Sequence, residues 1–123
     1  MIRKLDHLVI TTARLEVCIA FYRALGFEAA DAGGRWELYA GDIKINVHIE
    51  GRELEPKARH IQIGSADLCF ELEVSLAECL TRLERAGIPP ELGPVARHGV
   101  RGEMTSVYLR DPDDTLIELC RYE

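Results

Sequence analysis

The stretch LDHLVI, from Leu5 to Ile10, alternates apolar and polar residues with the period of a half-buried strand and places a histidine, His7, on one face of that strand. Beyond it, apolar residues recur every three or four positions until Gly26, which is typical of one face of a helix that ends at a glycine. These apolar residues are Leu15, Cys18, Ile19, Tyr22 and Leu25. The sequence therefore predicts a strand over 5–11 and a helix over 15–25.

A second helix is predicted further along the chain. It opens with a capping box, in which Ser75 is followed three residues later by Glu78, and closes at Gly87. Its apolar stripe consists of Leu76, Cys79, Leu80, Leu83 and Ala86. Two-residue alternation and turn residues predict strands over 27–31, 35–40, 43–49, 66–74, 88–92, 104–110 and 115–122. The order βαβββ thus occurs twice, which predicts an α+β fold.

Composition narrows the class of protein. A length of 123 residues suits one domain, with a first module over about 1–52, a linker over about 53–64 and a second module over about 65–123. The formal charge of -6 argues against nucleic-acid binding, and no apolar run is long enough to span a membrane. Four scattered cysteines without a C-x-x-C pair suggest reduced thiols. We expect a soluble, cytoplasmic protein.

Superposing the two halves brings metal-capable residues together in the alignment. His7 aligns with Asp67, Asn46 aligns with Glu118, and His48 lies one pleat beyond Asn46. All fall on the polar faces of their predicted strands. Nitrogen and carboxylate ligands of this kind suit a divalent transition metal with positions left open for substrate. The alternative is a polar face that is simply solvated.

The sequence resembles the vicinal oxygen chelate superfamily, which includes glyoxalase I, bleomycin- and fosfomycin-resistance proteins and extradiol dioxygenases. The resemblance rests on LDHLVI followed by FYRALGF (Phe21–Phe27), and on YLRDPDDTLIEL (Tyr108–Leu119), in that order. It covers essentially the whole chain and extends to a small glyoxalase-like subgroup. It implies that the two modules form a curved, incomplete-barrel mixed sheet with helices on its outer face and a metal in the cleft.

The resemblance also implies a ligand set. His7 matches the first-strand histidine and Glu118 the final-strand glutamate, while Asp67 replaces the histidine of the second module. In place of the glutamate found on the strand that 43–49 matches in glyoxalase I, this chain offers Asn46 or His48. We therefore expect His7, His48, Asp67 and Glu118 to bind nickel, zinc, manganese or iron, and Glu118 to act in catalysis.

Each residue also has a structural interpretation. His7 alone could be a core histidine, and Glu118 could form a salt bridge with Arg110. Asp67 could bind nearby backbone donors only. Arg110 or Lys44 could instead bind an anionic group of a substrate. The segment 93–102, which carries Arg97, is interpreted as a loop that either closes over the cleft or is a plain connection.

The resulting hypothesis is a metal-dependent, glyoxalase-like enzyme in which the metal acts as a Lewis acid on a small oxygenated substrate. One alternative is a binding or resistance protein of the same fold without chemistry, and another is an Fe(II) dioxygenase with two histidines and one carboxylate. We expect a homodimer, since in such proteins the cleft can combine the first module of one chain with the second of its partner.

Overall fold

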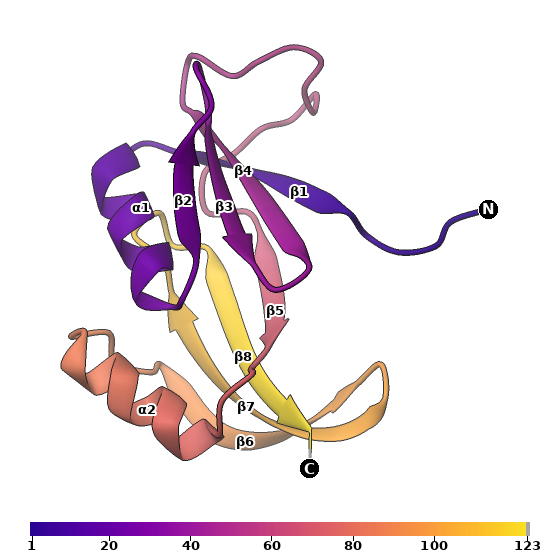
Figure 1. Cartoon of the computed structure of the whole chain (residues 1–123), viewed down its shortest axis with the longest axis vertical. Helices are drawn as coiled ribbons and strands as arrows, with labels where there is room; N and C mark the ends of the chain where they lie inside the picture. The colour runs from indigo at the N-terminus through magenta and orange to yellow at the C-terminus, as the bar shows by residue number, and fades with distance from the viewer. Residues whose placement is uncertain (123) are drawn as a thin grey trace. The chain divides into compact units, whose positions relative to one another are not determined.

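The computed structural model describes residues 1–122 and divides the chain into two compact units. The first comprises Met1–Ile63, and the second begins at Gly64 (Figure 1). Each unit contains one βαβββ module with a four-stranded mixed sheet, which confirms the predicted fold class and the doubled element order. Glu123, the last residue of the predicted second module, lies outside the described residues.

The first sheet has the strand order β1-β4-β3-β2, with β1 and β4 parallel and the other pairs antiparallel. Parallel pairing requires a long crossover, which here runs through the helix and the two intervening strands. The elements are β1 (His7–Thr12), α1 (Leu15–Ala24), β2 (Glu28–Asp31), β3 (Trp36–Ala40) and β4 (Ile43–Ile49).

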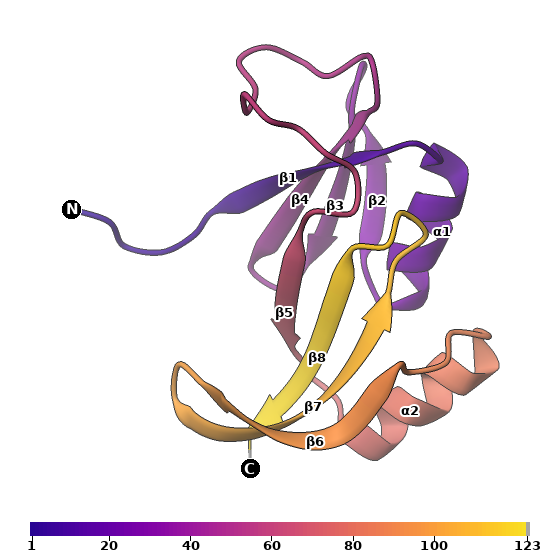
Figure 2. The ribbon, with the colours of Figure 1, turned by 180° about the vertical axis from the view of Figure 1, so that it is seen from behind.

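The second sheet repeats this arrangement with the order β5-β8-β7-β6, in which β5 and β8 are parallel (Figure 2). Its helix is capped as the sequence predicts, because the Ser75 side chain accepts a hydrogen bond from the Glu78 backbone N–H at 3.1 Å. The elements are β5 (Asp67–Glu71), α2 (Leu76–Arg85), β6 (Leu92–Gly99), β7 (Gly102–Arg110) and β8 (Leu116–Tyr122). Neither helix of the described chain is long and apolar enough to cross a membrane.

The cores follow from the alternation of each strand. Buried apolar side chains come from one face of each sheet and from the inner stripe of each helix. In the first unit they include Cys18, Tyr22, Leu38, Ile45 and Val47, and in the second Leu83, Val107, Leu109, Ile117 and Leu119. The opposite face of each sheet is left for polar side chains.

One predicted element is misplaced. The sequence predicts a strand over 88–92 and a loop over 93–102, whereas the strand β6 runs from Leu92 to Gly99 and meets β7 in a tight hairpin. The pair Gly93-Pro94 lies inside this strand. The structure accommodates it in a register shift between Leu92 and Val95, and β6 is an edge strand, where a missing backbone N–H is tolerated.

The turn before β8 is held by a buried carboxylate. The Oδ1 atom of Asp111 accepts hydrogen bonds from the backbone N–H groups of Asp113 and Thr115, both at 2.9 Å. Gly64 packs against the same turn, since a Cβ added there would lie 2.5 Å from the carbonyl oxygen of Asp113. The D-P-D-D-T segment therefore fixes the position at which β8 begins.

Candidate functional site

Glu118 lies at the centre of the polar face of the second sheet. On β8 it is directly opposite Cys69 of β5 on one side and Tyr108 of β7 on the other. Residues paired in this way point to the same face and lie within side-chain contact. A thiol and a phenol therefore flank the carboxylate.

Two polar atoms on this face are buried without a hydrogen-bond partner among residues 1–122: Oε1 of Glu118 and Oγ of Ser106. The predicted alternative for Glu118, a salt bridge to Arg110, is wrong. Arg110 instead pairs with Glu91, with Nε–Oε1 and Nη2–Oε2 distances of 3.2 Å each. A buried acceptor without a donor is costly, so Oε1 is an atom that a bound cation or donor would satisfy.

The first sheet has an equivalent atom. Asn46 of β4 lies opposite Val9 of β1 and Glu37 of β3, which is the place that Glu118 occupies in the second sheet. Its Oδ1 atom is likewise buried and lacks a partner in the described part of the chain. The aligned positions of the two halves thus hold two unsatisfied oxygens, one neutral and one from a carboxylate.

His7 at the start of β1 is partly exposed and is held by its neighbour. Its Nδ1 lies 2.7 Å from Oδ1 of Asp6, and this hydrogen bond to His7 lowers the pKa of Asp6. An ionised carboxylate on Nδ1 selects the tautomer in which Nε2 carries a lone pair, as in histidines that bind metals. His7 is therefore a ligand-competent side chain and not a core histidine.

His48 is buried, and its pKa is lowered, chiefly by burial and also by the positive charge of Arg35. Its ring is therefore neutral at pH 7. However, His7 is opposite Lys44, and His48 lies four residues further along β4, about 13 Å at the usual rise per residue. The first unit does not bring the two histidine rings together, whereas Asn46 lies between them.

Asp67 is exposed at the start of β5, opposite Leu116 and diagonal to Glu118. Among residues 1–122 no cluster of three or more histidine, cysteine, aspartate or glutamate side chains is placed to hold a metal. The combination of His7, His48, Asp67 and Glu118 in one site remains a prediction.

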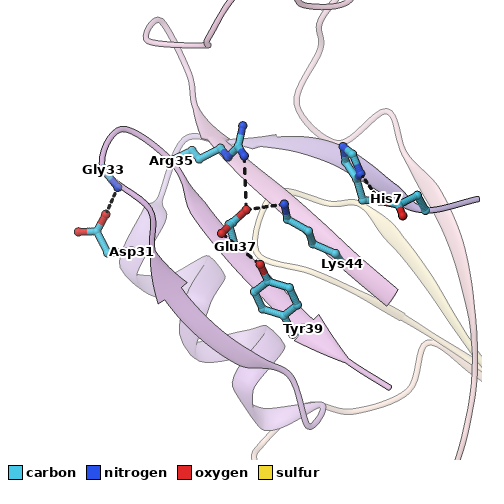
Figure 3. Close-up of polar contacts among 8 residues, drawn as sticks. His7, Asp31, Gly33, Arg35, Glu37, Tyr39 and Lys44 are labelled. Atoms are coloured by element: carbon cyan, nitrogen blue, oxygen red, sulfur yellow. Dashed lines mark hydrogen bonds and ion pairs between the residues drawn. The ribbon is translucent and has the colours of Figure 1, made fainter. Parts of the chain in front are cut away.

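The two cations expected to bind an anionic group are both neutralised. Lys44 Nζ lies 2.5 Å from Oε2 of Glu37, which also accepts a hydrogen bond from Arg35 at 3.4 Å, while Oε1 of Glu37 accepts one from the Tyr39 hydroxyl at 3.1 Å (Figure 3). These bonds lower the pKa of Glu37, the one from Lys44 most strongly. Arg110 is neutralised by Glu91, as described above.

Arg97 was missed as a candidate because the sequence placed it in a loop. On β6 its Nε donates to the Tyr108 hydroxyl at 2.9 Å, and its guanidinium lies 5.3 Å from the centre of the Tyr108 ring. Within the described chain no carboxylate pairs with Arg97. An unneutralised guanidinium thus stands beside the tyrosine that faces Glu118. Only the pairing of β6 with β7 shows that Arg97 lies beside Tyr108, and the sequence pattern alone does not predict that pairing.

The model of the Glyoxalase/Bleomycin resistance protein/Dioxygenase superfamily matches residues 4–119. The chain belongs to this superfamily. It is 46% identical over 123 residues to the glyoxalase domain-containing protein RDO1 of Mycosarcoma maydis, covering 99% of this chain and 70% of that protein. Over 124 residues it is 42% identical to the virulence protein STM3117 of Salmonella typhimurium, covering 99% of this chain and 86% of the relative.

The crystal structure of STM3117 superposes with a TM-score of 0.96 over 100% of this chain and 99% of that one. A more distant relative of the glyoxalase superfamily, the metallothiol transferase FosB of Shouchella clausii, is 25% identical over 130 residues, or 97% of this chain and 80% of that protein. The names of RDO1 and STM3117 specify no reaction, so these relatives establish the family and not an activity.

Each unit, taken by itself, carries donor atoms of the kinds that divalent cations bind. Glu118 offers a buried oxygen that lacks a donor among the described residues, and His7 offers Nε2 of a ring oriented by Asp6. The neutral oxygen of Asn46 is a third, weaker donor.

Proposed function

We propose that this chain is a divalent-metal-dependent enzyme of the glyoxalase superfamily that acts on a small, oxygenated, anionic substrate. The observation that carries the proposal is the buried Oε1 of Glu118, which has no partner within residues 1–122. A carboxylate loses hydration when it is buried and needs a cation or donors in return. A nickel, zinc, manganese or iron ion bound by His7 and Glu118 would meet this need.

A cation held there would supply Lewis acidity to the oxygens of the substrate. The side chains of the protein would supply the catalytic carboxylate and orient the ligands. Glu118 is the carboxylate that we assign to catalysis, because Glu71, a second carboxylate on this face of the sheet, is bound by both terminal nitrogens of Arg101 at 2.6 and 3.1 Å. Asp6 orients His7, and Asp67 remains a proposed additional ligand, whereas His48 lies too far along β4 from the position of His7 to bind the same ion.

We propose an anionic substrate because of the environment of Arg97, which is bound to Tyr108. The guanidinium has no carboxylate partner in the described chain, whereas Lys44 and Arg110 have theirs. Arginine binds carboxylates and phosphates through charge-assisted hydrogen bonds. A substrate with a carboxylate or phosphate at one end would place its neighbouring oxygens close to Glu118, which Tyr108 faces directly.

Metal analysis tests the proposal. Protein purified without chelator should contain about one ion per chain, and the double variant His7→Gln/Glu118→Gln should contain little. Glu103→Gln is the matched control, because Glu103 is an exposed carboxylate of the same sheet, paired with His98. If wild type and double variant are equally metal-poor and bind manganese, nickel, zinc and iron equally weakly, the enzyme proposal is wrong.

The second candidate is a small-molecule-binding or resistance protein that uses the same polar faces without chemistry. It is favoured by the neutral Asn46 at the position equivalent to Glu118, and by the exposed Asp67 in the place of a family histidine. This candidate predicts that a ligand binds equally well with and without metal. If the chain is instead a metal-dependent enzyme, removal of the metal by a chelator should abolish turnover of its substrate.

Assembly and location are also part of the proposal. We propose a homodimer, which light scattering after size-exclusion chromatography would show as twice the mass of one chain; a single-chain mass at every concentration would contradict it. We propose a cytoplasmic location, since all four cysteines carry thiols and not disulfides, as is usual in a reducing compartment.

A further inference from the structure

Arg101 links three strands of the second sheet at one end of its polar face. It lies at the tip of the β6–β7 hairpin, whose last pair is Gly99 and Gly102. Its two terminal nitrogens donate to the two carboxylate oxygens of Glu71, the last residue of β5, at 2.6 and 3.1 Å. Its guanidinium also lies 4.1 Å from the ring centre of Tyr122, the last residue of β8. A hairpin from one edge of the sheet is therefore fastened to the strand at the other edge.

The backbone of the hairpin tip, residues 99–102, also packs against Tyr122, and we call this tip the strap. The backbone N–H of Arg101 donates to the Tyr122 hydroxyl at 3.3 Å, and Figure 2 shows the hairpin curling past the C-terminal end of β8. A Cβ atom at residue 99 would collide with this hydroxyl and with the sulfur of Met104, so glycine permits the close approach. The strap is therefore held by an ion pair, a ring contact and a backbone hydrogen bond.

These contacts lie on the same face of the sheet as Glu118. Glu71 is opposite Cys120, and Cys120 and Tyr122 come two and four residues after Glu118 on β8, so their side chains share its face. At the usual rise per residue, Glu71 lies about 7 Å and Tyr122 about 13 Å along the strands from Glu118. The strap thus crosses the polar face within two side-chain pairs of this carboxylate.

We propose that Arg101 holds the strap closed over one end of the polar face, and that this closed end restricts the face to ligands with a short chain beyond their anionic group. The length limit rests on the proposed function, which assigns the anion to Arg97. The Arg97 guanidinium reaches the Tyr108 hydroxyl, and Tyr108 is opposite Glu118. A chain that extends from there toward the end of β8 meets Arg101 and Tyr122, whereas a short acid ends before them.

The first arm of the test needs no ligand and measures hydrogen exchange at the backbone N–H of residue 101 in the full chain. Arg101→Ala keeps this N–H but removes the ion pair and the ring contact, so its exchange, corrected for sequence, should be about two- to fivefold faster. Arg110→Ala is the matched control, because Arg110 forms a similar pair with Glu91 in the same unit, and it should leave residue 101 unchanged. Thermal unfolding checks that each variant is folded. Equal exchange in wild type and Arg101→Ala would overturn the inference.

The second arm is a nuclear magnetic resonance titration of the metal-free protein with acetate and with hexanoate. Wild type and Arg110→Ala should bind hexanoate about tenfold more weakly than acetate, and Arg101→Ala should bind the two acids within about threefold of each other. If wild type binds both acids equally, or Arg101→Ala discriminates as wild type does, the length limit is wrong and the proposed anion site stands. If wild type binds neither acid, the anionic substrate of the proposed function is wrong, and the length limit fails with it.

Discussion

At the scale of single residues, the most informative feature is which charged side chains already form an ion pair with an opposite charge. Lys44 and Arg110 are the cations that the sequence suggests for an anionic ligand, but each lies in an ion pair with a glutamate. Arg97 is bound only to neutral groups in the described chain, namely the Tyr108 hydroxyl and the Ala96 carbonyl oxygen. Arg97 is therefore the cation to which we assign the proposed binding of an anion.

We predict that Arg97→Gln weakens binding of inorganic phosphate or acetate to the metal-free protein by about tenfold, the loss of one charge-assisted hydrogen-bonding group. Nuclear magnetic resonance titration, followed at the backbone amides of β6 and β7, measures the affinity. Arg110→Gln should change it little, because Arg110 is neutralised by Glu91. A larger effect from Arg110→Gln than from Arg97→Gln would contradict the assignment. The two anions show whether carboxylate or phosphate is preferred.

His48 makes a prediction about stability and pH. Its pKa is lowered in the fold from an ordinary value near 6.5, mainly by burial, so the unfolded chain takes up a proton first as the pH falls. The stabilisation is complete above about pH 6.5 and is lost as the pH falls below that value. The denaturant midpoint of wild type should therefore drop between about pH 7.5 and about pH 5.5, and that of His48→Gln should drop less.

The control for this prediction is His60→Gln, because His60 is exposed. It should follow wild type at every pH. An identical pH dependence in wild type and His48→Gln would show that the buried ring does not control the acid response.

At the scale of elements, the turn before β8 sets the position of Glu118. Asp111→Ala should lower the free energy of unfolding by about 2 kcal/mol, because two backbone N–H groups lose a buried charged acceptor. Denaturant unfolding measures this loss, and Glu103→Ala, at an exposed carboxylate of the same unit, is the control. A loss as small as that of a surface substitution would mean that the carboxylate does not hold the turn.

Most elements could be predicted from alternation and helical spacing, because each strand and helix buries one face against its own unit. The alignment of the two halves also placed Asn46 and Glu118 correctly as counterparts, as their strand registers confirm. The position of β6 could not be predicted. A glycine and a proline inside it break the local pattern, and only pairing with β7 and the register shift at Leu92 and Val95 reveal the strand.

The site residues divide in the same way. His7, Glu118 and Asn46 follow from pattern and repetition, since they occupy strand positions. Arg97, and the ion pairs that exclude Lys44 and Arg110, depend on contacts between strands far apart in sequence. Composition and periodicity do not predict which residue a long charged side chain will pair with.

At the scale of the whole molecule, the chain is two βαβββ modules with the same register and different polar residues. Each has at the same place a buried oxygen without a hydrogen-bond partner among residues 1–122, but the first module offers an amide and the second a carboxylate. Repetition explains the shared geometry, and because of the difference in charge we propose the carboxylate of the second module as the stronger cation ligand. The central claim is that Glu118 binds a divalent metal through Oε1.

The most direct test is a titration of metal-free protein with manganese, in which electron paramagnetic resonance measures the free ion. The account predicts saturation near one ion per chain for wild type and an affinity lower by about 100-fold or more for Glu118→Gln, which keeps the shape and removes the charge. Glu103→Gln should bind as wild type does. Equal manganese affinity in wild type and Glu118→Gln would contradict the account.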